Sequence, residues 1–151
     1  EKGFKTNSTP SGVLEDPVNP MTWAICAGAT YVARGYAMDI MHLKKLIADG
    51  VKHKGFAIID VFQPCPTYNK IHTMDWFKPK LFKLEETEYE PTDKIAAIQM
   101  GQMWGEKIPI GVFYKEDKPT YEDGTPQIAA KPLVHHDISN IDISPLLAKF
   151  K

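Results

Sequence analysis

The fold is decided by residues 30–62, which read TYVARGYAMDIMHLKKLIADGVKHKGFAIIDVF. Within this stretch, residues 38–53 place apolar side chains at helical spacing with charged side chains opposite, which predicts an amphipathic helix. Residues 30–34 are β-branched and aromatic and predict a short strand that ends at Gly35. Residues 56–62 form a nearly continuous apolar run, which predicts a strand buried on both faces of a parallel sheet. Strand, helix and strand predict a βαβ unit with a right-handed crossover, and therefore an α/β fold class.

A second helix is expected before this unit. Asn19 is followed by Pro20, and an Asn side chain caps a first turn well, while Pro is tolerated at the first helical position. This pair predicts a helix over residues 21–27. Small residues follow it closely, which would allow a neighbouring element to approach.

The segment after the unit predicts one more helix and one more strand. Thr92 or Asp93 is expected to cap the helix. Residues 108–114 predict the strand, in which Pro109 favours an edge or strand-start position. Residues 70–91 predict an ordered but irregular connection. Its four glutamates are expected to be solvated; they are Glu85, Glu86, Glu88 and Glu90.

Composition narrows the class of protein. The chain has 151 residues, of which 43% are hydrophobic and 25% charged, the balance of one soluble globular domain. A formal net charge of -1 gives no electrostatic case for nucleic acid or for an anionic membrane as partner. No apolar stretch approaches the roughly 20 residues that span a bilayer. No signal peptide is visible, and the two cysteines are too few for a secreted disulfide framework, so we expect a reducing, cytoplasmic location.

Cys65 is the sharpest candidate for chemistry. It follows the predicted strand of residues 56–62, at the carboxyl end where open α/β sheets bind ligands. Pro64 and Pro66 flank it and hold the loop extended. A rigid thiolate there is able to serve as a nucleophile, a metal ligand or a redox centre, and a small buried hydrophobic residue is the equal alternative. A peroxidase loop is excluded, because Phe62 stands where that motif needs Thr.

The remaining thiol and the histidines give weaker signals. Cys26 is expected to pack inside a helix among small residues. His42 and His53 are expected at the rim of the amphipathic helix. His135 and His136 are expected in a solvated tail, since adjacent side chains point in different directions.

Several ordered stretches carry a family resemblance. They are similar to the beta subunit of 2-oxoacid:ferredoxin oxidoreductases, the subunit that binds thiamine diphosphate, and match its C-terminal half. The stretches are KTNSTP (5–10), EDPVNP (15–20), AGATYVAR (27–34), His42-Leu43, HKGFAIIDV (53–61), PCPTYN (64–69), IPIGVFY (108–114) and PTY (119–121).

The resemblance implies a reaction and a role for one residue. Members of this family decarboxylate a 2-oxoacid oxidatively on thiamine diphosphate and Mg²⁺. Electrons pass through a [4Fe–4S] cluster to ferredoxin, and the acyl group goes to coenzyme A. The cysteine of the PCPTYN loop is a cluster ligand in the family, and this implies a metal-ligand role for Cys65. The other three cluster cysteines and the Gly-Asp-Gly motif lie in the N-terminal half and are absent here, so no catalytic residue is assigned.

The resemblance also sets the expected organisation and partners. Residues 1–121 are expected to form the C-terminal half of a thiamine-diphosphate-binding domain with a partial parallel sheet, and residues 122–151 an irregular extension. An alpha subunit and ferredoxin are the implied partners. The isolated chain is expected to bind no cofactor, to be inactive, and to self-associate through an exposed sheet edge. The alternative from another class is a stand-alone α/β interaction module in which Cys65 is structural.

Overall fold

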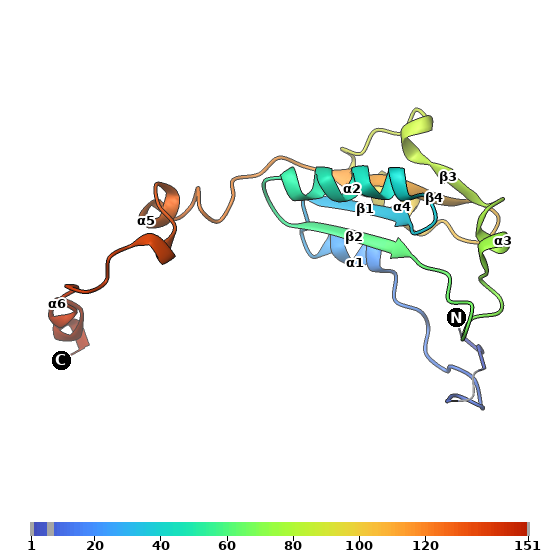
Figure 1. The fold of residues 1–151 in the computed structure, drawn as a ribbon, viewed down its shortest axis with the longest axis horizontal. Helices are drawn as coiled ribbons and strands as arrows, with labels where there is room; N and C mark the ends of the chain where they lie inside the picture. The colour runs from blue at the N-terminus through green and yellow to red at the C-terminus, as the bar shows by residue number, and fades with distance from the viewer. Residues whose placement is uncertain (1, 6–7, 151) are drawn as a thin grey trace. The chain divides into compact units, whose positions relative to one another are not determined.

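The chain forms two compact units, which divide between Lys118 and Pro119. The computed structural model describes residues 2–5 and 8–150, so Thr6 and Asn7 of the KTNSTP stretch lie outside the described residues. The first unit contains the sheet and its helices, and the second contains short helices (Figure 1).

The first unit is built on a mixed four-stranded sheet. Its strands are β1 (Tyr31–Tyr36), β2 (Ala57–Phe62), β3 (Leu81–Lys83) and β4 (Ile108–Lys115), in the order β2-β1-β4-β3. β1 pairs with β2 in parallel and α2 (Ile40–Lys52) connects them, which confirms the βαβ unit. β4 runs antiparallel to β1 and parallel to β3, so the α/β class is confirmed but the sheet is mixed. Strand direction follows from tertiary packing, which a local sequence pattern does not encode.

Side-chain caps set the helix starts, and the sequence indicated two of them, at Asn19 and at Thr92 or Asp93. The Asn19 side chain accepts from the Thr22 N–H at the start of α1 (Pro20–Cys26). Asp39 caps α2 in the same way. Asp93, and not Thr92, caps α4 (Lys94–Gly101). The remaining short helices of the first unit are α3 (Met74–Phe77) and the 3-10 turn η1 (Leu84–Glu86).

The helices cover both faces of the sheet (Figure 1). On one face, α1 packs against α4 and against β1, with Met21, Ile25 and Val32 in the shared core. On the other face, α2 packs on β1, and Leu46 meets Tyr31 there. Alternation along β1 therefore sends Val32 and Arg34 to the α1 face and Tyr31 and Ala33 to the α2 face.

The sequence predicted that the strand ends at Gly35, but β1 continues through Tyr36. A Cβ atom at Gly35 would lie 2.6 Å from Leu43 Cδ1 of α2. Glycine is therefore present because α2 approaches the strand closely, and a local sequence pattern cannot distinguish this use of glycine from a break.

β2 is a half-exposed edge strand and is not buried on both faces, contrary to the sequence prediction. Among the described residues, no strand pairs with its outer edge. Its apolar run is typical of a central strand, so the chain shows a central-strand sequence at an edge position.

Glu85 was expected to be solvated, but its carboxylate contacts a backbone N–H group and a histidine ring. The pairing of β1 with β4 shifts between Val32 and Ala33, which forms a bulge in β4. The Val112 N–H at this bulge donates to Glu85 Oε1 at 3.1 Å, and His42 Nε2 lies 3.3 Å from Glu85 Oε2. The carboxylate thus ties η1 to β4 and to α2.

The second unit holds α5 (Pro126–Ala129), η2 (Leu133–His135), α6 (Ser144–Leu147) and η3 (Ala148–Phe150). Its described residues are mostly exposed and it has no buried core of its own. No helix in the described part of the chain is long and apolar enough to cross a membrane.

Candidate functional site

The Cys65 loop, residues 63–72, follows β2, which ends at Phe62. Residues 66–68 form a turn, and the Asn69 N–H donates to the Cys65 carbonyl at 3.0 Å. The loop therefore folds back on itself directly after the strand and holds the thiol at the carboxyl end of the parallel pair. This is the position that open α/β sheets use for ligands.

The thiol itself is exposed, and backbone donors surround it. The N–H groups of Tyr68 and then Thr67 stabilise the thiolate and lower the pKa of Cys65, and Asn69 and the charge of Lys70 act in the same direction. Exposure argues against a packing role. A thiolate that accepts several N–H bonds is the form in which cysteine attacks electrophiles or binds metals.

Asn69 fixes the far end of the loop. Its Oδ1 accepts from the N–H groups of Ile71 and His72, both at 3.0 Å. Its Nδ2 lies 3.4 Å from His72 Nδ1. His72, which the sequence left without a role, packs its ring 4.5 Å from the ring centre of Trp76.

An aromatic cluster packs against both ends of the Cys65 loop. The ring of Phe62 at its start stacks on Phe77 at 5.1 Å and meets Trp104 edge-on at 5.7 Å. His72 at its end lies 5.7 Å from the same Trp104. Both ends of the loop are therefore held by one set of rings from β2, α3 and the segment after α4.

The other residues that the sequence singled out have structural or solvent-exposed positions outside the Cys65 loop. Cys26 is exposed at the last residue of α1, which corrects the expected packing role: the helix ends there and its buried face is carried by other residues. His53 bonds to Thr30 Oγ1 at 2.8 Å. His135 and His136 are exposed, as predicted. Within the described residues, no three or more His, Cys, Asp or Glu side chains cluster to hold a metal ion.

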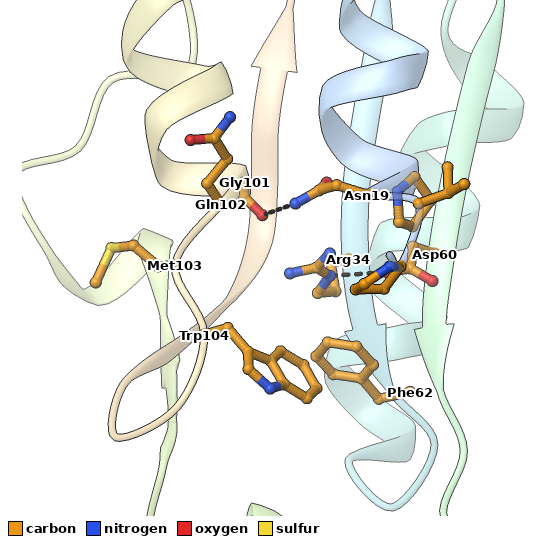
Figure 2. A pocket seen from close by; sticks show the side chains of 11 residues that line it. Asn19, Arg34, Asp60, Phe62, Gly101, Gln102, Met103 and Trp104 are labelled. Atoms are coloured by element: carbon orange, nitrogen blue, oxygen red, sulfur yellow. Dashed lines mark hydrogen bonds and ion pairs between the residues drawn. The ribbon is translucent and has the colours of Figure 1, made fainter. Parts of the chain in front are cut away.

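Sequence reasoning missed a partly buried ion pair beside a cavity. Arg34 on β1 and Asp60 on β2 face each other in register, and Arg34 Nε donates to Asp60 Oδ2 at 2.8 Å. The pair lines a cavity of about 420 Å³. Figure 2 shows the pair with the Phe62 and Trp104 rings on one side and Asn19 and Gly101 on the other. The available signal was two opposite charges at facing positions of adjacent apolar strands.

Comparison with known proteins agrees with the resemblance. Residues 65–130 match the family described as the C-terminal region of the pyruvate ferredoxin oxidoreductase beta subunit. A 2-oxoacid:ferredoxin oxidoreductase subunit beta from Sulfolobus sp is 45% identical over 134 residues, 82% of this chain and 44% of that protein. Subunit beta of 2-oxoacid:ferredoxin oxidoreductase 1 from Aeropyrum pernix is 43% identical over 133 residues, 81% of this chain and 42% of that protein.

A solved structure shares the fold. The 2-oxoglutarate:ferredoxin oxidoreductase from Magnetococcus marinus, with 2-oxoglutarate, coenzyme A and succinyl-CoA bound, matches with a TM-score of 0.81 and 30% identity. The match covers 99% of this chain and 50% of that chain. The chain thus spans less than half the length of the two curated relatives and half of this structure.

The α/β sheet and these matches define an oxidoreductase subunit segment. The family is that of the 2-oxoacid:ferredoxin oxidoreductase beta subunits, to which the chain belongs over the part it spans, and the resemblance noted from the sequence is confirmed.

Proposed function

We propose that this chain is the C-terminal part of a 2-oxoacid:ferredoxin oxidoreductase beta subunit and that Cys65 is one ligand of its [4Fe–4S] cluster. The intact enzyme would convert a 2-oxoacid and coenzyme A to acyl-CoA and pass electrons to ferredoxin. The observation that carries the proposal is the Cys65 loop: an exposed thiol, whose pKa is lowered by backbone N–H groups, in a segment that matches the family.

The loop suits a cluster ligand for a physical reason. Hydrogen bonds to cluster sulfurs are one way in which proteins tune the cluster potential, and Cys65 already accepts N–H donors from its own turn. A cubane cluster takes about four cysteine ligands, and the chain has two cysteines. The remaining ligands would come from elsewhere in the enzyme. When bound, the cluster supplies one-electron transfer, and the chain contributes a rigid thiolate to it.

Thiamine diphosphate and Mg²⁺ do not fit the residues of this chain. It has no Gly-Asp-Gly motif, and its described residues hold no cluster of carboxylates for a cation. These cofactors therefore belong to the intact enzyme in this proposal, and the isolated chain is expected to be inactive. An alpha subunit and ferredoxin are the proposed partners, supported by the subunit names of the relatives. The two free thiols support a cytoplasmic location.

The cluster assignment is tested in the intact beta subunit that carries this segment. Cys65→Ser is expected to lower the iron content and to change the cluster's visible absorption after anaerobic reconstitution. Cys26→Ser, which alters the other exposed thiol, is the matched control and should leave both unchanged. If the Cys65 variant retains full iron and an unaltered spectrum, the ligand role is wrong and the alternative, an interaction module with a structural cysteine, is preferred.

The open edge of β2 is the proposed site of self-association for the isolated chain. An unpaired apolar edge offers backbone N–H and C=O groups to a second strand. Val61→Lys places a charge on this strand at a partly exposed side chain, and is expected to convert a dimer to a monomer in size-exclusion chromatography. Ile47→Lys, at an exposed side chain of α2, is the control. A monomeric wild-type chain would contradict the proposal.

A further inference from the structure

The cavity beside Arg34 is lined by one buried polar atom that the described residues leave without a hydrogen-bond partner. The Arg34 side chain is 4% exposed, and within the described residues its Nη1 is buried without a hydrogen-bond partner. The one other charged residue that lines the cavity is Asp60, whose Oδ2 accepts a hydrogen bond from Arg34 Nε. A buried donor without an acceptor costs free energy, so this atom is a place where an acceptor atom of a ligand would bind favourably.

The guanidinium is held in place by its surroundings. Its central carbon lies 4.7 Å from the ring centre of Phe62 and 5.4 Å from that of Phe113. Together with the bond to Asp60, these contacts fix the plane of the group. The side chain is therefore pre-organised, and a ligand would pay little conformational entropy to bind it.

The electrostatics of the cavity favour an anion. Burial lowers the pKa of Arg34, and a single bonded carboxylate, that of Asp60, only partly opposes this effect. The other residues that line the cavity are uncharged. A second carboxylate would fit the free side of the guanidinium, whose fork of N–H groups matches two carboxylate oxygens.

The walls define the rest of the ligand. Phe62 and Trp104 present two rings at 5.7 Å, and Val18 and Met103 add aliphatic surface. The Asn19 Nδ2 bond to the Gly101 carbonyl, 2.8 Å long, joins the start of α1 to the end of α4 and leaves these groups already paired. Figure 2 shows the guanidinium between this bridge and the ring pair. The cavity volume, about 420 Å³, is that of a small-molecule site.

We propose that this cavity binds a small carboxylate with an apolar or aromatic body, with Arg34 as the carboxylate-binding residue. The site is separate from the cluster ligand proposed above and requires neither iron nor a second subunit. Its test uses the 151-residue chain without metal, so the failure of either proposal leaves the other standing.

The probe is sodium phenylacetate, with phenylacetamide as the neutral analogue of the same shape. Binding is followed by the ¹⁵N-edited NMR signals of the Arg34 Nε–H and the Trp104 indole N–H. Phenylacetate is expected to shift both signals in a saturable manner, with a Kd on the order of 1 mM for a ligand of this size. Phenylacetamide is expected to bind at least about tenfold more weakly, because it lacks the charge-assisted bonds.

Two variants and a control locate the binding. Arg34→Lys keeps the charge but loses the planar fork, and should weaken phenylacetate binding about tenfold or more. If that variant does not fold, Met103→Trp decides the question, since it fills the cavity without touching the ion pair. Met38→Trp, on another surface, is the control and should bind as the wild type does. Equal binding of acid and amide, shifts that do not saturate, or full binding by Met103→Trp would overturn the proposal.

Discussion

Replacing Tyr31 by Phe is expected to destabilise the chain at neutral pH and to stabilise it relative to the wild type in strong alkali. The Tyr31 side chain is 2% exposed, and its hydroxyl donates to the Leu46 carbonyl at 3.2 Å. Burial, chiefly, and the charges of Asp49 and Glu85 raise the pKa of Tyr31 to about 12. The folded chain therefore favours the neutral phenol more strongly than the unfolded chain does.

The sign and size of the effect follow from this difference. An unfolded tyrosine has a pKa of about 10, so the folded-state pKa is raised by about two units, which corresponds to about 2.7 kcal/mol. This contribution is fully present below about pH 10 and is lost as the pH rises through about 12; at pH 11 about 1.4 kcal/mol is gone. Tyr31→Phe gives up about 1 kcal/mol of hydrogen bonding that the neutral phenol makes. The stability curves of wild type and variant should therefore cross between about pH 10 and 11.

Urea unfolding followed by circular dichroism at several pH values from about 7 to 11.5 measures the crossing. Lysines and other tyrosines titrate alike in both proteins, so their effects cancel in the difference. Tyr121→Phe, at an exposed tyrosine, is the control and should give a curve parallel to that of the wild type. A constant difference between wild type and Tyr31→Phe across the range would refute the reasoning.

Three further outcomes are expected. Because its pKa is lowered, Cys65 should react with iodoacetamide at lower pH than N-acetylcysteine does; peptide mass spectrometry at a series of pH values measures this, and coincident pH profiles would count against it. Glu85→Ala should lower the free energy of unfolding in urea by about 1 kcal/mol, a figure already discounted for the partial exposure of the side chain, because the bulge N–H of Val112 loses its acceptor. Glu85→Gln should lower it less, and equal losses in the two variants would speak against that bond. Gly35→Ala should cost about 1–3 kcal/mol through the clash with Leu43, and an unchanged urea midpoint would show that α2 can shift freely.

Local signals predicted α1, α2, α4 and the βαβ unit, but they missed α3 and β3, which lie in the segment of residues 70–91 that was expected to be irregular. Asn19 and Asp93 each bond a backbone N–H of the first turn, which is a short-range property that the sequence states directly. The antiparallel direction of β4 and the bulge near Val112 were not predictable in this way. They depend on which strand β4 meets and on a carboxylate that lies 27 residues away in the chain.

The same distinction applies to the two sites. Cys65 was predictable because a cysteine between prolines after an apolar strand is a local pattern. The Arg34 cavity was not, because it requires the register that places Arg34 opposite Asp60 and the approach of residues 101–104, at the end of α4 and just beyond it. A site built from three segments that are distant in the sequence cannot be predicted before the pairing of the strands is known.

Phe62 connects these two sites physically. Its ring stands 4.7 Å from the Arg34 guanidinium and 5.1 Å from the ring of Phe77, and it is the last residue of β2 before the Cys65 loop. An edge strand has hydrogen bonds on one side only and frays easily at its end. The ion pair of Arg34 with Asp60 and the ring contacts of Phe62 hold this end of β2, because the outer edge has no partner strand among the described residues. The position of the Cys65 thiol therefore depends on the same ring that forms a wall of the cavity, and a carboxylate bound at Arg34 would contact the group that anchors the loop.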